Sequence, residues 1–153
     1  ASEIDAFREM HQNFQQDIAA TNSILEKSIL KTDAMKRALD EAKRPTPALY
    51  SKIFNARTAL LGLNKQMKGN PAKNEVGEKP PPAPGDGSLV GYDELGNTYG
   101  PTGNHKAAME RAQNQLKGIK KELGVLASTM SNLEEELKAA GAPWIEGQGL
   151  LED

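Results

Sequence analysis

The chain has 153 residues, a formal net charge of −2 and no cysteine. One domain is the expected count at this length, and the near-neutral charge argues against a general nucleic-acid binder, whose binding face is usually basic. The lack of cysteine excludes disulfides, thiolate metal sites and a cysteine nucleophile.

Two further features of the sequence bear on its context. No apolar run approaches the roughly 18 residues of a membrane-spanning helix, so we expect no membrane span. The chain starts at Ala1, without a methionine and without a signal segment. We therefore expect it to be a domain excised from a larger protein.

Residues 2–43 contain neither Gly nor Pro and predict one helix of about forty residues. Eight of its twelve heptad core positions, here called the seam, are apolar: Ile4, Phe7, Phe14, Ile18, Leu25, Met35, Leu39 and Ala42. Thr21, Ser28 and Thr32 weaken the middle of the seam. A break near residues 22–23 is therefore the alternative.

Residues 47–68 predict a second helix. Thr46 followed by Pro47 is typical of an N-cap and a first helical residue, and Gly69 is a typical left-handed C-cap. The short connection requires this helix to run antiparallel to the first. Its seam is apolar throughout: Leu49, Ile53, Ala56, Leu60, Leu63 and Met67.

All charged residues of the second helix are basic, namely Lys52, Arg57, Lys65 and Lys68. We expect them to pair with acids of the first helix, such as Glu26, Asp33 and Asp40. A docking face for an acidic partner is the alternative.

Residues 70–103 predict a long Pro/Gly-rich loop, since thirteen of the 35 residues from 70 to 104 are Pro or Gly. Its second half also contains apolar and aromatic residues, among them Tyr92 and Tyr99. Because the second helix is too short to cover the long helices on either side, we expect part of this loop to lie along the groove that the second helix leaves open.

Residues 104–140 predict the third helix, with Asn104 as N-cap and Gly141 as C-cap. All ten seam positions from Met109 to Ala140 are apolar. The only tryptophan, Trp144, follows the helix and should fold back over its last turn. The remainder of the tail, residues 141–153, is acidic towards its end.

Three matching seams predict an all-α fold in a single domain, residues 1–153. It is an antiparallel three-helix bundle, coiled-coil-like and up-down-up, with the long loop between the second and third helices.

The sequence contains no recognisable active site. His11 and His105 belong to no metal or catalytic motif, and no nucleophile elbow or phosphate-binding loop occurs. Four residues of the loop could suggest calcium, but their spacing is not that of an EF-hand: Asp86, Asp93, Glu94 and Asn97. We therefore predict no catalytic residue, no metal and no cofactor. The candidates for interaction or packing are Tyr92, Tyr99 and Trp144.

Three motifs occur in order: LNKQMKGNP at residues 63–71, YGPT at 99–102 and AAGAPW at 139–144. Together they resemble the C-terminal region of bacterial sortilin-like BNR/Asp-box repeat proteins, which carry β-propellers and are often labelled glycosyl hydrolases. The loop from residue 85 to 97 is longer and richer in glycine than in that family, and no Asp-box occurs here. No catalytic residue can therefore be carried over.

The resemblance implies an accessory C-terminal module of an exported protein, in a bacterial periplasm, at the cell surface or secreted. We expect a non-catalytic structural or interaction module that packs against its own propeller or a protein partner. One alternative is a free-standing helical adaptor that oligomerises through exposed parts of its seams. The other is a glycan-binding or hydrolase-associated module that uses Tyr92, Tyr99, Trp144 and the loop acids.

Overall fold

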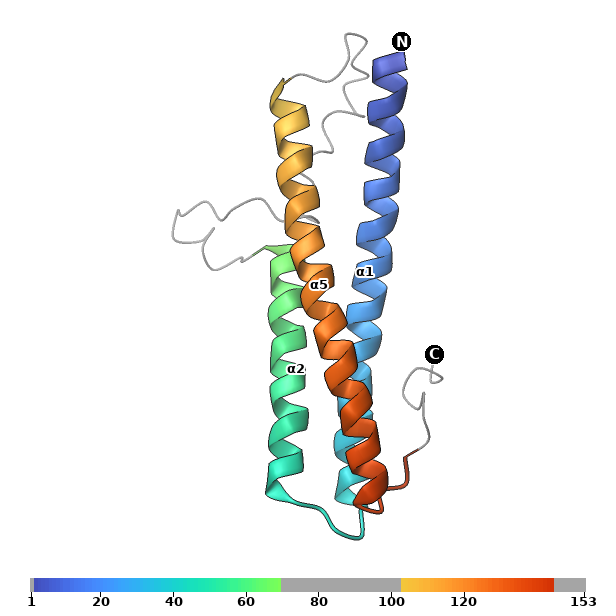
Figure 1. Cartoon of the computed structure of the whole chain (residues 1–153), viewed down its shortest axis with the longest axis vertical. Helices are drawn as coiled ribbons and strands as arrows, with labels where there is room; N and C mark the ends of the chain where they lie inside the picture. Colours follow the sequence, from blue (N-terminus) through green and yellow to red (C-terminus); the bar gives the residue numbers. More distant parts are fainter. Residues whose placement is uncertain (1, 70–102, 145–153) are drawn as a thin grey trace. The chain divides into compact units, whose positions relative to one another are not determined.

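The computed structural model describes residues 2–69 and 103–144, and these form three helices and no strand. They are α1 (Ser2–Asp40), α2 (Pro47–Lys68) and α5 (Gly103–Ala139). The helices pack against one another as an up-down-up three-helix bundle, which confirms the predicted fold class (Figure 1). None of the described helices combines the length and the hydropathy that a membrane crossing requires.

The chain divides into two compact units. Unit 1 comprises Ala1–Asn22 and Lys65–Lys120, and unit 2 comprises Ser23–Asn64 and Lys121–Asp153. The first half of α1 and of α5 therefore belongs to unit 1, while the second halves join nearly all of α2 in unit 2. Each unit has its own core of buried seam residues, from Phe7, Phe14 and Leu116 in unit 1 to Leu39, Leu60 and Leu137 in unit 2.

Helix α1 is continuous, so the alternative of a break near residues 22–23 is wrong. The two buried threonines of its seam do not interrupt it, because each hydroxyl donates to a carbonyl of the same helix. Thr21 Oγ1 bonds to the Asp17 carbonyl at 2.8 Å, and Thr32 Oγ1 bonds to the Ile29 carbonyl at 2.6 Å. A buried hydroxyl with such a partner costs little.

The helix ends follow the predicted capping chemistry with small differences. Thr46 Oγ1 accepts a hydrogen bond from the Leu49 N–H at 3.2 Å, as expected of an N-cap. The C-caps Gly69 and Gly141 have φ values of 80° and 76°, which favour glycine. Helix α1 ends three residues before residue 43, in a turn whose N–H groups bond to carbonyls three residues back. Helix α5 begins at Gly103, so Asn104 lies inside it.

Ion pairs between α1 and α5 recur at a constant offset of 103 residues. In unit 1 they are Glu3–Lys106 and Asp17–Lys120, the latter at 3.0 Å, and in unit 2 Lys31–Glu134 at 2.6 Å. The two helices are therefore parallel within each unit. The pairs occur at every second heptad of α1. At the heptads between them, the same offset places two uncharged residues side by side: Met10 with Gln113, and Ile24 with Ala127. Met10 and Ile24 are 46% and 52% exposed.

Polar contacts fix α2 antiparallel to both neighbours in unit 2. Arg57 pairs with Asp33 of α1, which confirms one predicted ion pair. Lys52 instead pairs with Glu136 of α5 at 2.7 Å. Asp40 accepts a hydrogen bond from the Tyr50 hydroxyl at 2.6 Å.

The other predicted partners on these helices do not meet. Asp40 forms its ion pair within α1, with Lys36 at 3.5 Å, so the expected pairing with a basic residue of α2 is wrong. Within the described part of the chain, Glu26, Lys65 and Lys68 form no ion pair. These three side chains lie on exposed helix faces.

Candidate functional site

Of the three predicted interaction residues, the structure describes Trp144. Its indole is buried, 6% exposed, and its Nε1–H donates to Glu134 Oε2 at 3.0 Å. The predicted folding back of Trp144 onto α5 is therefore confirmed. Tyr92 and Tyr99 lie outside the described residues, as do the groove-packing segment and the loop acids considered for calcium.

Glu134 connects the tail to α1. It accepts hydrogen bonds from Lys31 Nζ at 2.6 Å and from Trp144, and its side chain is 8% exposed. Burial raises the pKa of Glu134, but the hydrogen bonds from Lys31 and Trp144 and the charge of Lys31 together outweigh it. The pKa of this carboxyl therefore lies below its usual range. We call Lys31, Glu134 and Trp144 the tail lock.

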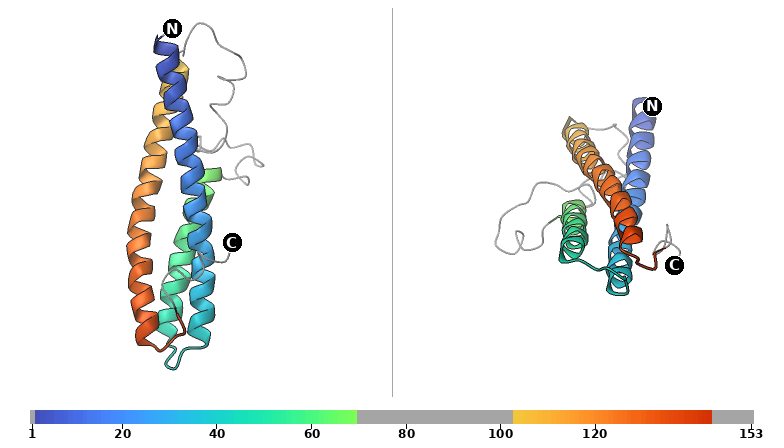
Figure 2. Two further views of the ribbon diagram at one scale, coloured as in Figure 1. Left: turned by 90° about the vertical axis from the view of Figure 1, so that its right-hand side faces the viewer. Right: turned by 60° about the horizontal axis from the view of Figure 1, so that its bottom comes forward.

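The α1–α2 connection closes the same end of unit 2, as the two views of Figures 1 and 2 agree. The Arg44 N–H donates to the Ala140 carbonyl at 2.9 Å, and its guanidinium donates to the Ala139 carbonyl at 2.7 Å. These are carbonyls at the end of α5 that lack a partner within the helix. The tail lock and Arg44 thus bind residues 139–144 to α1 and the α1–α2 connection through buried side chains and hydrogen bonds.

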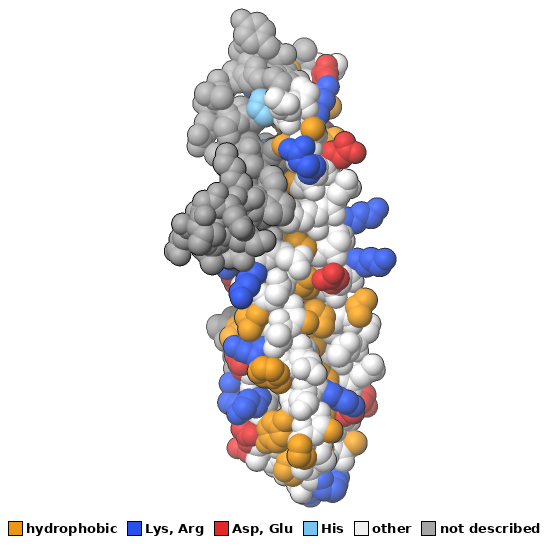
Figure 3. Space-filling model, turned by 90° about the vertical axis from the view of Figure 1, so that its left-hand side faces the viewer, with side chains coloured by type: hydrophobic (Ala, Val, Ile, Leu, Met, Phe, Trp, Pro, Cys, Tyr) orange, Lys and Arg blue, Asp and Glu red, His pale blue; other side chains and the backbone are white. Residues whose placement is uncertain are grey.

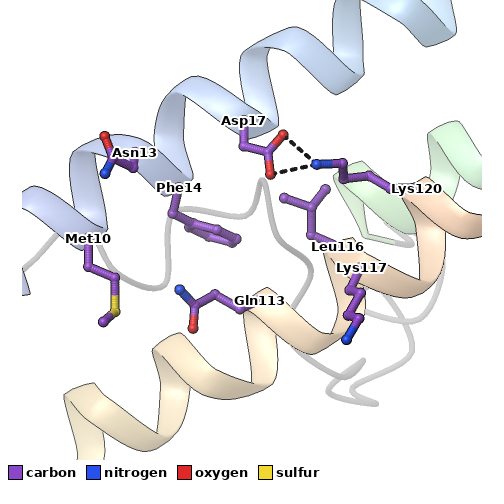
Figure 4. A pocket seen from close by; sticks show the side chains of 8 residues that line it. All are labelled: Met10, Asn13, Phe14, Asp17, Gln113, Leu116, Lys117 and Lys120. Carbon is purple, nitrogen blue, oxygen red and sulfur yellow. Dashed lines mark hydrogen bonds and ion pairs between the residues drawn. The ribbon is translucent and has the colours of Figure 1, made fainter.

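A hollow of about 390 Å³ lies between α1 and α5 in unit 1 (Figure 4). It occurs at the uncharged pair Met10 and Gln113, and the Asp17–Lys120 ion pair closes one end. Phe14 and Leu116 form its apolar floor. The lining includes no histidine, serine or cysteine, and its ionisable side chains are Asp17, Lys117 and Lys120, of which Asp17 and Lys120 are paired with each other. It can hold an apolar group of modest size.

A second hollow of about 390 Å³ lies between α2 and α5 in unit 2. The Lys52–Glu136 ion pair closes one end, and Ala56, Leu126 and Leu133 form the floor. Leu126 is half-buried, whereas every other seam residue of α5 is buried.

The register of α2 against α5 explains the partial exposure of Leu126. With Lys52 beside Glu136, Gly62 lies opposite Leu126 and Ala59 lies opposite Thr129. Neither Gly62 nor Ala59 has a side chain long enough to cover the leucine. A Cβ built on Gly62 would have no described atom within 4 Å, so the space beside it is open.

Beside this second hollow, beyond the Lys52–Glu136 pair, α5 carries no charge over about three helical turns and α2 carries none over about two. Residues 123–133 of α5 and 58–64 of α2 contain no Asp, Glu, Lys or Arg, although these make up 26% of the chain. Val125 stands 63% exposed at the edge. Figure 3 faces α2, and below the grey atoms a mainly uncharged strip runs between charged side chains. We call the following set the neutral flank: Asn55, Ala59, Gly62, Val125, Thr129 and Asn132.

Sequence reasoning missed the neutral flank and the role of Glu134. The flank could have been found from the eleven consecutive uncharged residues, 123–133, in an otherwise highly charged helix. The role of Glu134 was not evident from the sequence, since it stands in a run of three glutamates. Only the folded structure shows that Glu134, and not Glu135 or Glu136, contacts Lys31 and Trp144.

The described residues 2–69 and 103–144 contain no group of three or more His, Asp or Glu side chains that could hold a metal ion. His11 is 5% exposed and His105 is half-exposed. No family model, curated protein or solved structure matches this chain. The resemblance to sortilin-like proteins therefore stays a prediction.

Proposed function

We propose that the chain is a non-catalytic helical interaction module that binds a protein surface through the neutral flank. The observation that carries the proposal is the incomplete seam at Leu126. Here a core leucine is left half-exposed next to Val125, within three turns of α5 that contain no charge. Burial of both side chains by a partner would be favourable at about 25 cal/mol per Å² of apolar area.

The chemistry of the flank favours a protein partner. The centres of protein interfaces are depleted in charged residues, whereas nucleic acids and acidic headgroups are bound by Lys and Arg. Asn55, Thr129 and Asn132 supply amides and a hydroxyl at the edges of the groove, where they can bond to a partner's polar atoms. Small residues on the α2 wall allow close approach of another helix.

The alternative of a glycan-binding module uses Tyr92, Tyr99, Trp144 and the loop acids, of which the structure describes Trp144. Sugar sites commonly present an exposed aromatic ring, and the ring of Trp144 is buried with its N–H bonded to Glu134. The hollow beside Met10 contains an aromatic residue, Phe14, but this is only 5% exposed. Neither of these two rings is available for stacking on a sugar, whereas the Phe54 ring on α2 is 67% exposed.

We further propose that the module is an accessory C-terminal domain of an exported bacterial propeller protein, at the periplasm, the cell surface or outside the cell. The order and spacing of the motifs at residues 63–71, 99–102 and 139–144 support this context. An antibody against this chain tests it on extracts of the source cells. A band several times larger than 16.5 kDa is expected, and a band near 16.5 kDa would overturn it.

Site-specific photocrosslinking in the source cells tests the interaction itself. A photoreactive residue replaces Thr129 on the flank or, as the matched control, the exposed Ser131, which lies about 200° further around the same helix. We expect a covalent adduct from position 129 and little from position 131, and Val125→Lys should abolish the adduct from position 129. Equal yields at both positions, or no adduct from the expressed chain at either, would contradict the proposal.

A further inference from the structure

We propose that the neutral flank binds the same flank of a second copy of this chain, around a twofold axis parallel to the helices. This inference rests on the proposed function and names the partner. In such a dimer α5 of each copy lies against α2 of the other, and each residue has the same height along the axis in both copies. A twofold interface requires a surface that is complementary to itself.

The shape of the flank meets that requirement. Val125 projects from α5, while Gly62 and Ala59 leave open space on α2 at a similar level of the bundle. Around a parallel twofold axis, Val125 of each copy enters the space beside Gly62 of the other. The same contact covers the half-exposed Leu126, so that both incomplete seams are closed at once.

The charges at the end of the flank favour the same arrangement. Lys52 and Glu136 are paired within one chain, yet their side chains remain 54% and 42% exposed. A parallel twofold axis brings Lys52 of each copy beside Glu136 of the other, so the four charges alternate in sign. An antiparallel arrangement centred on Thr129 would instead bring Glu136 near Glu122 of the second copy, and like charges at an interface oppose binding.

Because the neutral flank has no charged residue, it favours a partner whose surface is also uncharged. Any surface that covers the flank loses water from its own charged groups, so it must be uncharged over the same length. Within the described part of the chain, the flank itself is a surface of this kind. This is why we choose a second copy over a charged partner surface.

The size of the flank predicts a weak dimer. Eleven residues of helix span about 16 Å, and two helices about 9 Å apart give a face roughly 20 Å wide. The buried area is therefore about 300 to 400 Å² per copy, below the roughly 800 Å² per partner of a standard complex. We expect a Kd on the order of 10 to 1000 μM.

Sedimentation equilibrium of the purified full chain from about 10 μM to 1 mM tests the proposal. We expect reversible association to twice the mass of one chain, lost in Val125→Lys and retained in the matched control Ser131→Lys. Gly62→Leu should also give a monomer, because the new side chain fills the space that receives Val125. Leucine favours helix over glycine, so circular dichroism should show that this variant is folded.

Disulfide trapping tests the orientation, since the chain has no cysteine of its own. Chains carrying Val125→Cys are mixed with differently tagged chains carrying Ala59→Cys and oxidised in air. A mixed disulfide dimer is expected. If Thr129→Cys chains link to each other while the mixture does not, the arrangement is antiparallel and the proposal is wrong.

The outcomes separate this inference from the proposed function. A chain that stays monomeric at 1 mM overturns the dimer. If photocrosslinking at position 129 then yields an adduct that is not twice the mass of the chain, the interaction module stands with a different partner. If position 129 also yields no adduct, both proposals fail.

Discussion

Removal of the Glu134 carboxylate should destabilise unit 2 far more than removal of its neighbour. In Glu134→Ala, the Trp144 indole N–H loses its acceptor and the Lys31 ammonium loses its counterion, although the Lys31 side chain is only 15% exposed. An unpaired buried donor costs about 1–3 kcal/mol, and breaking a buried ion pair costs about 3–5 kcal/mol. Because Lys31 can turn partly to water, we expect a total of about 2–4 kcal/mol.

The measurements are urea unfolding for the free energy and thermal unfolding for the Tm, each followed by circular dichroism and by the fluorescence of Trp144, the only tryptophan. A loss of about 3 kcal/mol should lower the Tm by roughly 6–12 °C in a chain of this length. Glu135→Ala is the matched control, since that side chain is 75% exposed and contacts Lys138 at 3.4 Å. Its effect should stay within about 0.5 kcal/mol.

A double variant isolates the charge. Lys31→Met with Glu134→Gln removes both charges but leaves an amide oxygen that can accept the Trp144 N–H. It should cost less than Glu134→Ala, because a neutral pair leaves no buried charge without a partner. Equal unfolding free energies for Glu134→Ala and Glu135→Ala would refute the role of the tail lock.

Three further predictions follow from local geometry. The pKa of Glu134 is lower in the folded chain than in the unfolded one, so its contribution is complete above the unfolded pKa of about 4.3. This contribution to the free energy of unfolding is lost as pH falls through the pKa of Glu134 in the folded chain. In an acid titration, the Trp144 fluorescence of Glu134→Gln should therefore change less over this pH range than that of the unchanged chain. Gly62→Ala should stabilise the monomer by about 0.5–1 kcal/mol in urea unfolding. Gly141→Ala should destabilise it, since φ is 76° and the new Cβ would lie 3.0 Å from the Lys43 side chain; the same sign for both glycines would contradict this. Thr46→Ala should cost about 1 kcal/mol through the lost N-cap, whereas Ser51→Ala, at the exposed fifth residue of α2, should not destabilise the chain.

The sequence was sufficient for the helices because each helix repeats one simple rule. The seam of α5 is apolar at all ten positions, and nine of them are buried in the structure. Thr46, Gly69 and Gly141 marked helix ends through local chemistry, which acts within a few residues. The continuity of α1 at Thr21 was harder to predict, because it depends on a hydroxyl that bonds to the Asp17 carbonyl.

The sites depend on contacts between residues distant in sequence, where patterns are less informative. Lys52 was expected to pair with α1, yet it lies at the side of α2 that faces Glu136. Heptad positions would have shown this, because positions on either side of the seam face different neighbours. The partial exposure of Leu126 could not have been foreseen without the register of Gly62 against it.

The three ion pairs between α1 and α5 oppose a shift of one helix along the other by one or two heptads. A slip of one heptad would place Lys120 beside an uncharged residue, Met10 or Ile24, so each ion pair would be lost. A slip of two heptads would still bring an acid of α1 beside a lysine of α5 at one position. The Lys31–Glu134 pair has its lysine on α1 and its acid on α5, so the same slip also brings two like charges together. In one direction Lys120 would meet Lys31, and in the other Glu134 would meet Asp17. The buried Lys31–Glu134 pair therefore opposes the two-heptad slips that the other two ion pairs would allow, which a seam of interchangeable apolar residues cannot do.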